Sequence, residues 1–293
     1  MKFHTDSFFS FGQKHIVAGK PCQDYASSGE DEEKKLAFAI VSDGCSTGRN
    51  TDVGSRLLVL ITIKTIREYW EYLGGVFEDM SSKVLLHRKK VIKGIKELLG
   101  ITHEDMLATS IFACCSQTSG FVYVQGDGVT AMKYKDGSIN MTRFEWPQNM
   151  PFYPAYEDNG LDAFIVAHGG DEKANTVSAD NWFMDTKGEF TKTDDTMYSL
   201  EAGIHGIKLP IAINEDIEFI AIFSDGVTQI DNVDWKKAVE EFLNFKSTAG
   251  EFAKRRMIAG IKQAMKVGKG PFDDMSYAII HVTDEETLKG KSK

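Results

Sequence analysis

The stretch Leu36–Gly44, LAFAIVSDG, is an unbroken apolar run that ends abruptly in Ser-Asp-Gly. The same pattern returns as IEFIAIFSDG at residues 217–226, where Asp225 takes the place of Asp43. Both runs have the length and composition of buried strands, and the glycine after each aspartate permits a sharp turn. A single Asp-Gly after a strand is usually a hairpin turn. Two copies favour a second interpretation, in which the fold brings Asp43 and Asp225 together to hold metal.

The composition of the chain is that of a soluble globular protein. Its 293 residues suffice for one large domain or two small ones, and 42% hydrophobic with 26% charged residues is an ordinary balance. The formal net charge of −9 gives no indication of a nucleic-acid surface. No run approaches the roughly 18 apolar residues of a membrane span. We therefore expect no nucleic-acid or membrane partner. The sequence contains no pattern that indicates an oligomeric state.

The cysteines and the N-terminal residues bear on the cellular compartment. The four cysteines are too few and too irregularly spaced for a disulfide framework, and none forms a CxxC pair typical of zinc; they are Cys22, Cys45, Cys114 and Cys115. The first residues, MKFHTDSFF, lack the apolar core of a signal peptide. These features predict a cytoplasmic protein with reduced thiols.

Hydrophobic periodicity predicts strands and helices that are segregated along the chain. We expect one or two strands within residues 3–17, helices over 52–75 and from a cap at Ser81 or Ser82 to 99, strands over 107–116, 121–125, 129–134 and 164–167, helices over 233–245 and 249–267, and a last strand over 276–282. Such segregation favours an α+β fold with antiparallel sheets and helical pairs packed outside them. The weakly patterned residues 141–205 are interpreted as an irregular lid or insertion within one domain of residues 1–285, followed by a polar tail over 286–293.

Four aspartates, each at a predicted strand edge beside a turn, suggest metal-dependent hydrolysis: Asp24, Asp43, Asp225 and Asp273. Hard divalent cations prefer oxygen ligands, and a short Asp side chain can bring its carboxylate to a metal from a rigid strand end. Two Mg²⁺ or Mn²⁺ ions, roughly 3.5–4 Å apart, would generate a hydroxide and clamp a phosphoryl oxygen. No protein nucleophile is needed for this chemistry.

Five motifs in chain order carry a resemblance to a known family. They are Gln23-Asp24, the apolar strand into Asp43-Gly44, Gly126-Asp127-Gly128, Ser224-Asp225-Gly226 and Asp273-Asp274-Met275-Ser276. In this order they resemble the protein phosphatase 2C family (PPM-type Ser/Thr phosphatases), and most of all its bacterial branch. The resemblance implies a four-layer α/β/β/α sandwich of two antiparallel sheets, with a metal cleft at one end.

The resemblance also implies roles for individual residues and a substrate. Asp43 would bridge two metal ions, with the Gly44 carbonyl and Asp24 serving one ion and Asp225 and Asp273 the other. Asp43 and Asp225 would then act in catalysis through metal-activated water. The implied cofactors are two Mg or Mn ions, and the implied partner is a protein phosphorylated on serine or threonine. Asp127 matches a family position near the sheet edge, and we interpret it as structural.

The chain departs from the family pattern at the phosphate-binding position. The family usually has an arginine five residues before its first aspartate, where this chain has Gly19. Lys20, His15 and Arg49 are the candidates to bind substrate phosphate instead, although lysine offers a point charge rather than a bidentate fork. The loop after Asp43 lacks the histidine of eukaryotic members, and the family's Asp-His segment linked to a third metal is not recognisable.

Two other functions remain open from the sequence. Residues 44–48, GCSTG, match the GxSxG elbow of serine hydrolases with Ser46 as nucleophile. His168 begins a His-Gly-Gly segment that resembles an oxyanion segment, and His281 is the last histidine of a possible Ser, Asp, His order. Against this, few residues precede the motif, the His-Gly-Gly segment follows it, and His281 falls inside a predicted strand. The loss of arginine at Gly19 also suits a catalytically weak binding module on a phosphatase-like fold, but all four candidate metal carboxylates are present.

Overall fold

Two antiparallel sheets lie face to face in the computed structural model, which describes residues 1–72, 80–157, 161–167, 176–266, 268 and 270–283. One sheet has the strand order β1-β12-β11-β6-β7-β8-β9 and the other has the order β10-β5-β4-β3-β2. The strands are β1 (Lys2–Ser10), β2 (Tyr25–Asp31), β3 (Leu36–Ser42), β4 (Ser110–Cys115), β5 (Ser119–Gln125), β6 (Gly128–Tyr134), β7 (Ile139–Glu145), β8 (Val177–Met184), β9 (Phe190–Tyr198), β10 (Ile207–Ala212), β11 (Ile217–Phe223) and β12 (Met275–Thr283).

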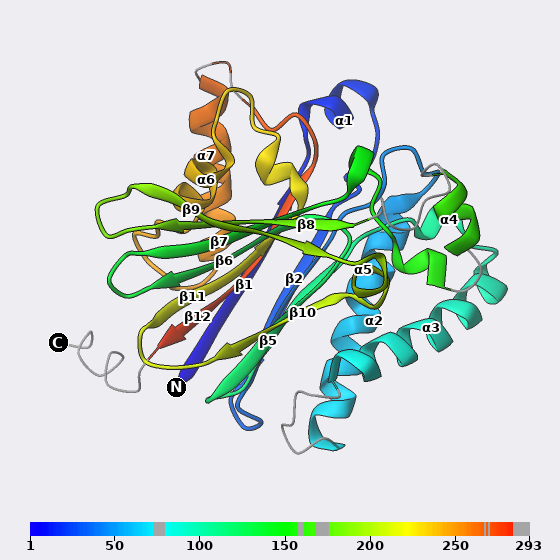
Figure 1. The fold of residues 1–293 in the computed structure, drawn as a ribbon, viewed down its shortest axis with the longest axis horizontal. Coiled ribbons are helices and arrows are strands. Elements are labelled where there is room, and N and C mark those ends of the chain that lie inside the picture. The colour runs from blue at the N-terminus through cyan, green and yellow to red at the C-terminus, as the bar shows by residue number, and fades with distance from the viewer. Residues whose placement is uncertain (73–79, 158–160, 168–175, 267, 269, 284–293) are drawn as a thin grey trace.

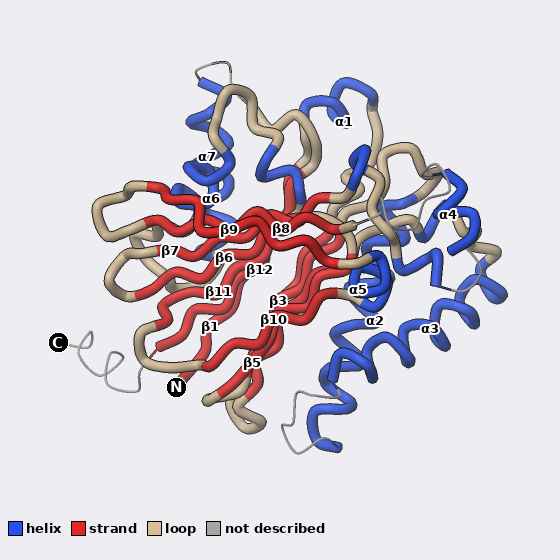
Figure 2. The backbone as a smooth tube through the Cα atoms, viewed as in Figure 1, coloured by secondary structure: helices blue, strands red, loops and turns tan. Residues whose placement is uncertain are grey.

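Helices cover the outer faces of both sheets (Figure 1). The described helices are α1 (Gln13–Ala18), α2 (Thr51–Tyr72), α3 (Met80–Leu99), α4 (Leu161–Ala167), α5 (Leu200–His205), α6 (Trp235–Phe242) and α7 (Phe252–Lys266). The pair α2 and α3 lies on the five-stranded side and the pair α6 and α7 on the seven-stranded side, so that the sheets form the two middle layers (Figure 2). The α+β sandwich predicted from the sequence is thus confirmed. Within the described residues, no helix is both long and apolar enough to cross a membrane.

The strand β3 explains why an antiparallel sheet contains an uninterrupted apolar run. Its residues 37, 39 and 41 pack between the two sheets with Ile220 and Ile222 of β11. Its residues 36, 38 and 40 point the other way and pack with Val59 and Trp70 of α2. All seven residues of the strand are buried, because both faces are covered. Full burial of such large apolar side chains contributes about 1.5–3 kcal/mol each.

Strand register brings distant loops to one end of the sandwich. Tyr25 pairs with Ser42, so the start of β2 lies beside the end of β3. Phe223 pairs with both Val129 and Tyr277, so the end of β11 lies beside the starts of β6 and β12. Among the acidic residues of the loops at these points are Asp24, Asp43, Asp127, Asp225 and Asp273.

Three local predictions were wrong. Residues 13–18 form the helix α1 rather than a strand, and Gly19 ends it in the left-handed region with a φ of 63°. Residues 161–167 form the helix α4, where a strand over 164–167 was expected; an apolar run of four residues suits either structure, and packing decides. Ser81 and Ser82 lie inside α3 instead of capping it.

The segment 141–205 is more regular than the sequence indicates. It contains β8 and β9, which extend the seven-stranded sheet to its edge. The outermost strand, β9, has the sequence FTKTDDTMY and is largely exposed, so it lacks the apolar alternation that identifies a strand. Between β7 and β8, the described residues form no strand and include α4 and two short 3₁₀ turns, η2 (Pro147–Asn149) and η3 (Pro154–Glu157). The expected helix end at residues 74–75 and the tail at 286–293 lie outside the described residues.

Candidate metal centre

A cleft of about 760 Å³ opens at the end of the sandwich where the acidic loops meet. Its lining includes the aspartates Asp43, Asp127, Asp225 and Asp273. It also includes aromatic residues from the irregular segment, namely Tyr153, Tyr156 of η3 and Phe164 of α4. The cleft thus joins the ends of strands from both sheets to the least regular part of the chain.

Backbone hydrogen bonds hold Asp43 in place from both neighbouring strands. The Asp43 N–H donates to the Thr109 hydroxyl over 2.9 Å, and the Thr109 N–H donates to the Asp43 carbonyl over 2.8 Å. On the other side, the Gly44 N–H donates to the Gln23 carbonyl over 3.1 Å. A Cβ at Gly44 would lie 2.7 Å from the Thr51 carbonyl oxygen, so the tight passage into α2 requires glycine.

Asp225 begins a short 3₁₀ turn, η5 (Asp225–Thr228), and its position depends on the loop before β12. Its carboxylate accepts a hydrogen bond of 2.7 Å from the Gln229 side chain. A Cβ at Gly226 would overlap the carbonyl oxygen of Asp274. The two acidic loops therefore pack backbone against backbone, which brings the Asp225 and Asp273 side chains into one cleft.

Asp24 lies behind the cleft, with 1% of its surface exposed. Neither carboxylate oxygen has a hydrogen-bond partner among the described residues, although the Ser224 and Ser276 hydroxyls lie near enough to favour its charged form. Burial raises the pKa of Asp24 to about 7. A buried carboxylate without a partner is unfavourable unless something else supplies the missing interaction, and a cation would do so.

The other carboxylates also disfavour one another. Burial raises the pKa of Asp43 well above its ordinary range, and repulsion from Asp24 and Asp225 adds to this effect. Burial raises the pKa of Asp127 in the same way, with repulsion from Asp225 next in importance. Asp127, which the sequence led us to interpret as structural, lines the cleft together with the other aspartates, and its role stays a prediction. Bound cations would reverse this mutual penalty.

The residue after Asp273 has a separate role. The Asp274 carboxylate accepts hydrogen bonds from the Gly12 N–H over 2.8 Å and the Gln23 N–H over 2.7 Å, and it contacts the His15 ring nitrogen Nδ1. His15 is 1% exposed and is absent from the cleft wall. Its ring is enclosed between Asp274 and Asp273, with Nε2 3.6 Å from the Asp273 carboxylate. Phosphate binding by His15 stays a prediction that this enclosed position does not support.

A lysine that the sequence motifs do not reveal lines the cleft instead. Lys14 of α1 places its Nζ 3.4 Å from the Asp273 carboxylate. The other two candidates are exposed and do not line the cleft, although Lys20 donates to the carbonyl of Ser46, a cleft residue, over 3.4 Å; the second is Arg49. Lys14 was missed because residues 13–18 were expected to form a strand, and no motif marks it.

The carboxylate oxygens of the cleft are suitable ligands for hard divalent cations, even though they do not yet surround a single point. Within the described ranges, no three His, Cys, Asp or Glu side chains already surround one point as ligands of a single ion. The oxygens present are nevertheless those that Mg²⁺ or Mn²⁺ prefers, and the pKa of each of Asp24, Asp43 and Asp225 is raised by burial. A bound cation would offset the cost of holding these carboxylates together.

The serine-hydrolase alternative finds little support in this arrangement. Ser46 lines the cleft, but His281 lies in β12 six residues beyond its first residue, which is roughly 20 Å along a strand. The His281 ring stacks on Phe219 with 4.7 Å between ring centroids. His168 lies outside the described residues.

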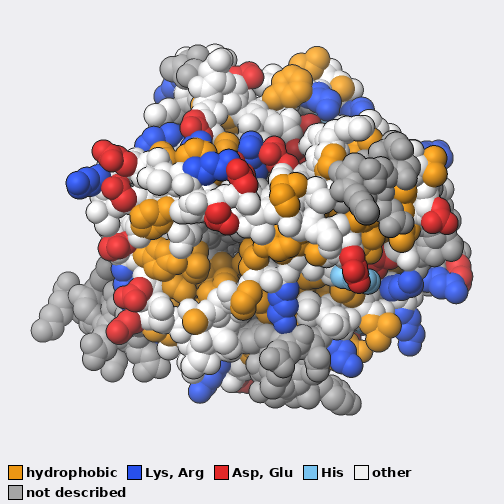
Figure 3. Space-filling view, viewed as in Figure 1, with side chains coloured by type: hydrophobic (Ala, Val, Ile, Leu, Met, Phe, Trp, Pro, Cys, Tyr) orange, Lys and Arg blue, Asp and Glu red, His pale blue; other side chains and the backbone are white. Residues whose placement is uncertain are grey.

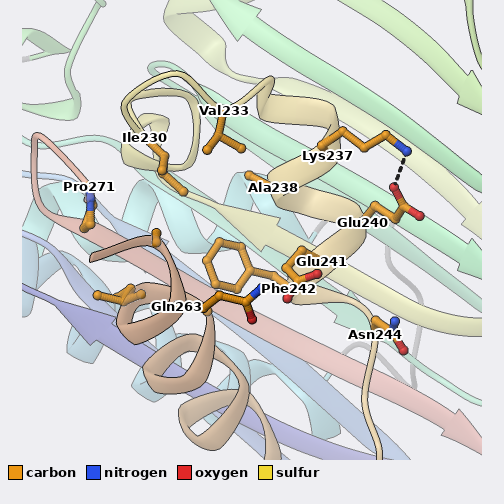
Figure 4. A pocket seen from close by; sticks show the side chains of 13 residues that line it. Ile230, Val233, Lys237, Ala238, Glu240, Glu241, Phe242, Asn244, Gln263 and Pro271 are labelled. Carbon is orange, nitrogen blue, oxygen red and sulfur yellow. Dashed lines mark hydrogen bonds and ion pairs between the residues drawn. The ribbon is translucent and has the colours of Figure 1, made fainter. Parts of the chain in front are cut away.

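A second cavity, of about 400 Å³, lies between α6 and α7 and differs in character. Its walls are mainly apolar, with Ile230, Val233 and Phe242 among them, and an ion pair between Lys237 and Glu240 lies at its rim (Figure 4). None of the acidic loop residues borders it. The chemistry for binding metal therefore belongs to the cleft.

Comparisons with known proteins agree with this fold. The family model for protein phosphatase 2C matches residues 11–153, just under half of the chain. A Streptococcus agalactiae serine/threonine phosphatase is similar over 96% of this chain and 100% of its own, with a TM-score of 0.53 and 13% identity. The Staphylococcus aureus phosphatase Stp1 is similar over 97% of this chain and 96% of its own, with a TM-score of 0.53 and 11% identity. The Mycobacterium tuberculosis phosphatase PstP is similar over 97% of this chain and 100% of its own, with a TM-score of 0.51 and 10% identity.

The chain is thus protein phosphatase 2C-like, as the five sequence motifs indicated. Its two-sheet sandwich is the fold of these bacterial Ser/Thr phosphatases. Comparison with curated protein sequences gives no significant match.

Proposed function

We propose that this protein is a metal-dependent phosphatase that hydrolyses phosphoserine and phosphothreonine in proteins. The observation that carries the proposal is the convergence of four cleft carboxylates from separate loops, with the unpartnered Asp24 directly behind them. These residues are far apart in the sequence, and the family match covers three of the five loops.

The positions of these residues support an assignment of the ligands that would hold the ions. Asp43 is affected by the charges of both Asp24 and Asp225, so it is the natural shared ligand. The Gly44 carbonyl and Asp24 would complete one site, and Asp225 with Asp273 the other. Two Mg²⁺ or Mn²⁺ ions bound here would activate water as a nucleophile and neutralise charge on the phosphoryl group.

The chain itself would position the substrate. Lys14 would attract the dianionic phosphate into an otherwise acidic cleft, in place of the arginine that is absent at Gly19. Gln229 holds the Asp225 carboxylate from behind, and the Asp43 backbone is fixed by Thr109. The aromatic residues of the cleft lining would contact the peptide that carries the phosphate.

Hydrolysis of p-nitrophenyl phosphate with Mn²⁺, Mg²⁺ or EDTA tests this proposal. We expect activity that requires a divalent ion and that Asp225→Ala abolishes while Ser46→Ala retains it. Esterase activity that is independent of metal and lost in Ser46→Ala would support a serine hydrolase. Metal binding without turnover would support the binding-module alternative, which the missing arginine at Gly19 favours.

A further inference from the structure

The helix α3 carries a concentrated positive charge on an acidic protein. Its 20 residues include six Lys or Arg and a single Glu, whereas the whole chain has a net charge of −9. At 100° per residue, one side of the helix gathers five lysines, which we term the lysine ridge: Lys83, Lys89, Lys90, Lys93 and Lys96. Lysine and arginine side chains are visible along the α3 side of the molecule (Figure 3).

The opposite face of α3 fixes the ridge toward solvent. Val84 and Ile92 pack against the rest of the protein, and the fully buried Arg88 donates to Glu157 over 2.7 Å and to Gln125 over 2.6 Å. On the ridge side, Lys90 and Lys93 are exposed. Leu86 lies between the lysines and is 67% exposed, so the ridge also offers an apolar contact.

The ridge adjoins the cleft through the segment that contains η3. The Lys89 ammonium donates to the Glu157 carbonyl over 3.4 Å, and Lys96 borders a small cavity together with Pro154. Tyr153 and Tyr156 of this same segment line the cleft. A peptide bound in the cleft would therefore reach the ridge by crossing one short element.

We infer that the lysine ridge binds an acidic segment of the phosphoprotein substrate, beside the residue to be dephosphorylated. This inference rests on the proposed function. The ridge offers carboxylates beside the phosphate a surface of opposite charge, whereas the cleft lining itself is rich in carboxylates. Exposed charge pairs are individually weak, so the ridge acts by their number, through steering and local concentration, and its effect falls with salt.

Two phosphothreonine peptides that differ only in flanking runs of six aspartates or six asparagines test the inference. We expect wild-type kcat/KM to be about tenfold higher for the aspartate peptide at low ionic strength, and the two values to converge at high salt. The double variant K90E/K93E should lose this preference. Its hydrolysis of p-nitrophenyl phosphate, which is too small to reach the ridge, should equal wild type.

The matched control is K262E/K266E, an equal charge reversal on the exposed side of α7, and it should keep the preference. Fluorescence anisotropy of the labelled aspartate peptide measures its binding to the ridge without requiring turnover. A protein that binds this peptide but does not hydrolyse it would contradict the phosphatase proposal and leave the ridge inference standing. Equal kcat/KM for both peptides, or an unchanged preference in K90E/K93E, would overturn the inference. So would binding to phosphatidylserine vesicles that K90E/K93E abolishes, if no peptide preference accompanies it.

Discussion

At the scale of single residues, the cleft concentrates carboxylates that are unfavourable neighbours. Asp43, Asp127 and Asp225 share a space where burial raises the pKa of each, and like charge raises it further. A protein gains no stability from such an arrangement by itself. The cost is understandable if cations are bound there, since an ion interacts favourably with every one of these groups.

Asp225→Asn separates the functional role from the structural cost. The amide has the same shape as the carboxylate but no charge, so repulsion with Asp43 is removed. We expect phosphatase activity to fall by about a hundredfold or more, because metal-ion catalysis supplies several kcal/mol. Thermal unfolding in EDTA should show unchanged or higher stability. Activity within a few-fold of wild type would contradict the assignment of Asp225 as a metal ligand.

Lys14→Met tests the replacement for the missing arginine. This change removes the cation beside Asp273 while keeping the aliphatic length of the side chain. We expect kcat/KM for a phosphothreonine peptide to fall about tenfold, mainly through KM, since one charge-assisted contact to phosphate is lost. Lys20→Met is the matched control and should change little. The reverse order of effects would return the role to Lys20.

At the scale of elements, the two strands that end in Ser-Asp-Gly could be predicted because both of their faces are covered. Burial leaves an unbroken apolar run in β3 and an apolar run interrupted only by the half-buried Glu218 in β11. The short α1 and α4 could not be predicted, since six or seven residues do not establish a helical period. The edge strand β9 was missed because most of its residues are exposed and polar, so the sequence shows no alternation of apolar and polar residues. Lys14 was missed together with α1, the element that carries it.

The packing of η5 against the loop before β12 yields a prediction about Gly226. In Gly226→Ala the new Cβ would meet the Asp274 carbonyl, so the two acidic loops would have to separate. We expect a loss of roughly 1–3 kcal/mol in the free energy of unfolding and weaker Mn²⁺ binding by calorimetry.

Gly94→Ala provides the control for this change. Gly94 lies in α3 with open space around its Cβ position, and alanine there should stabilise the protein by about 0.5–1 kcal/mol. Equal stability of the two variants would show that the loops are not in the close contact described.

At the scale of the whole molecule, stability should depend on pH and metal together. The folded pKa of Asp24, about 7, lies above its ordinary value of 3.8, so the folded state retains a proton that the unfolded state releases first. The associated stability is fully present below about pH 4 and is lost as the pH rises to about 7. Metal-free protein should therefore melt at a lower temperature at pH 8 than at pH 5.

Divalent ions should reverse this trend. They bind deprotonated carboxylates, so Mn²⁺ should raise the melting temperature more at pH 8 than at pH 5. Differential scanning fluorimetry in EDTA and in Mn²⁺ measures both effects. If the stability of the metal-free protein rises from pH 5 to pH 8, the pKa of Asp24 is not raised by burial as described. The cytoplasmic location and the single domain over residues 1–285 stay predictions.

The central claim is that Asp43 joins two metal sites at the end of the sandwich, and anomalous diffraction from crystals soaked in Mn²⁺ tests it most directly. We predict two anomalous peaks that both lie within coordination distance of the Asp43 carboxylate. One peak should also contact Asp225 and Asp273, and the other the Gly44 carbonyl on the side of Asp24. Density with no manganese at Asp43, from a crystal in which Mn²⁺ is bound elsewhere or not at all, would contradict the account.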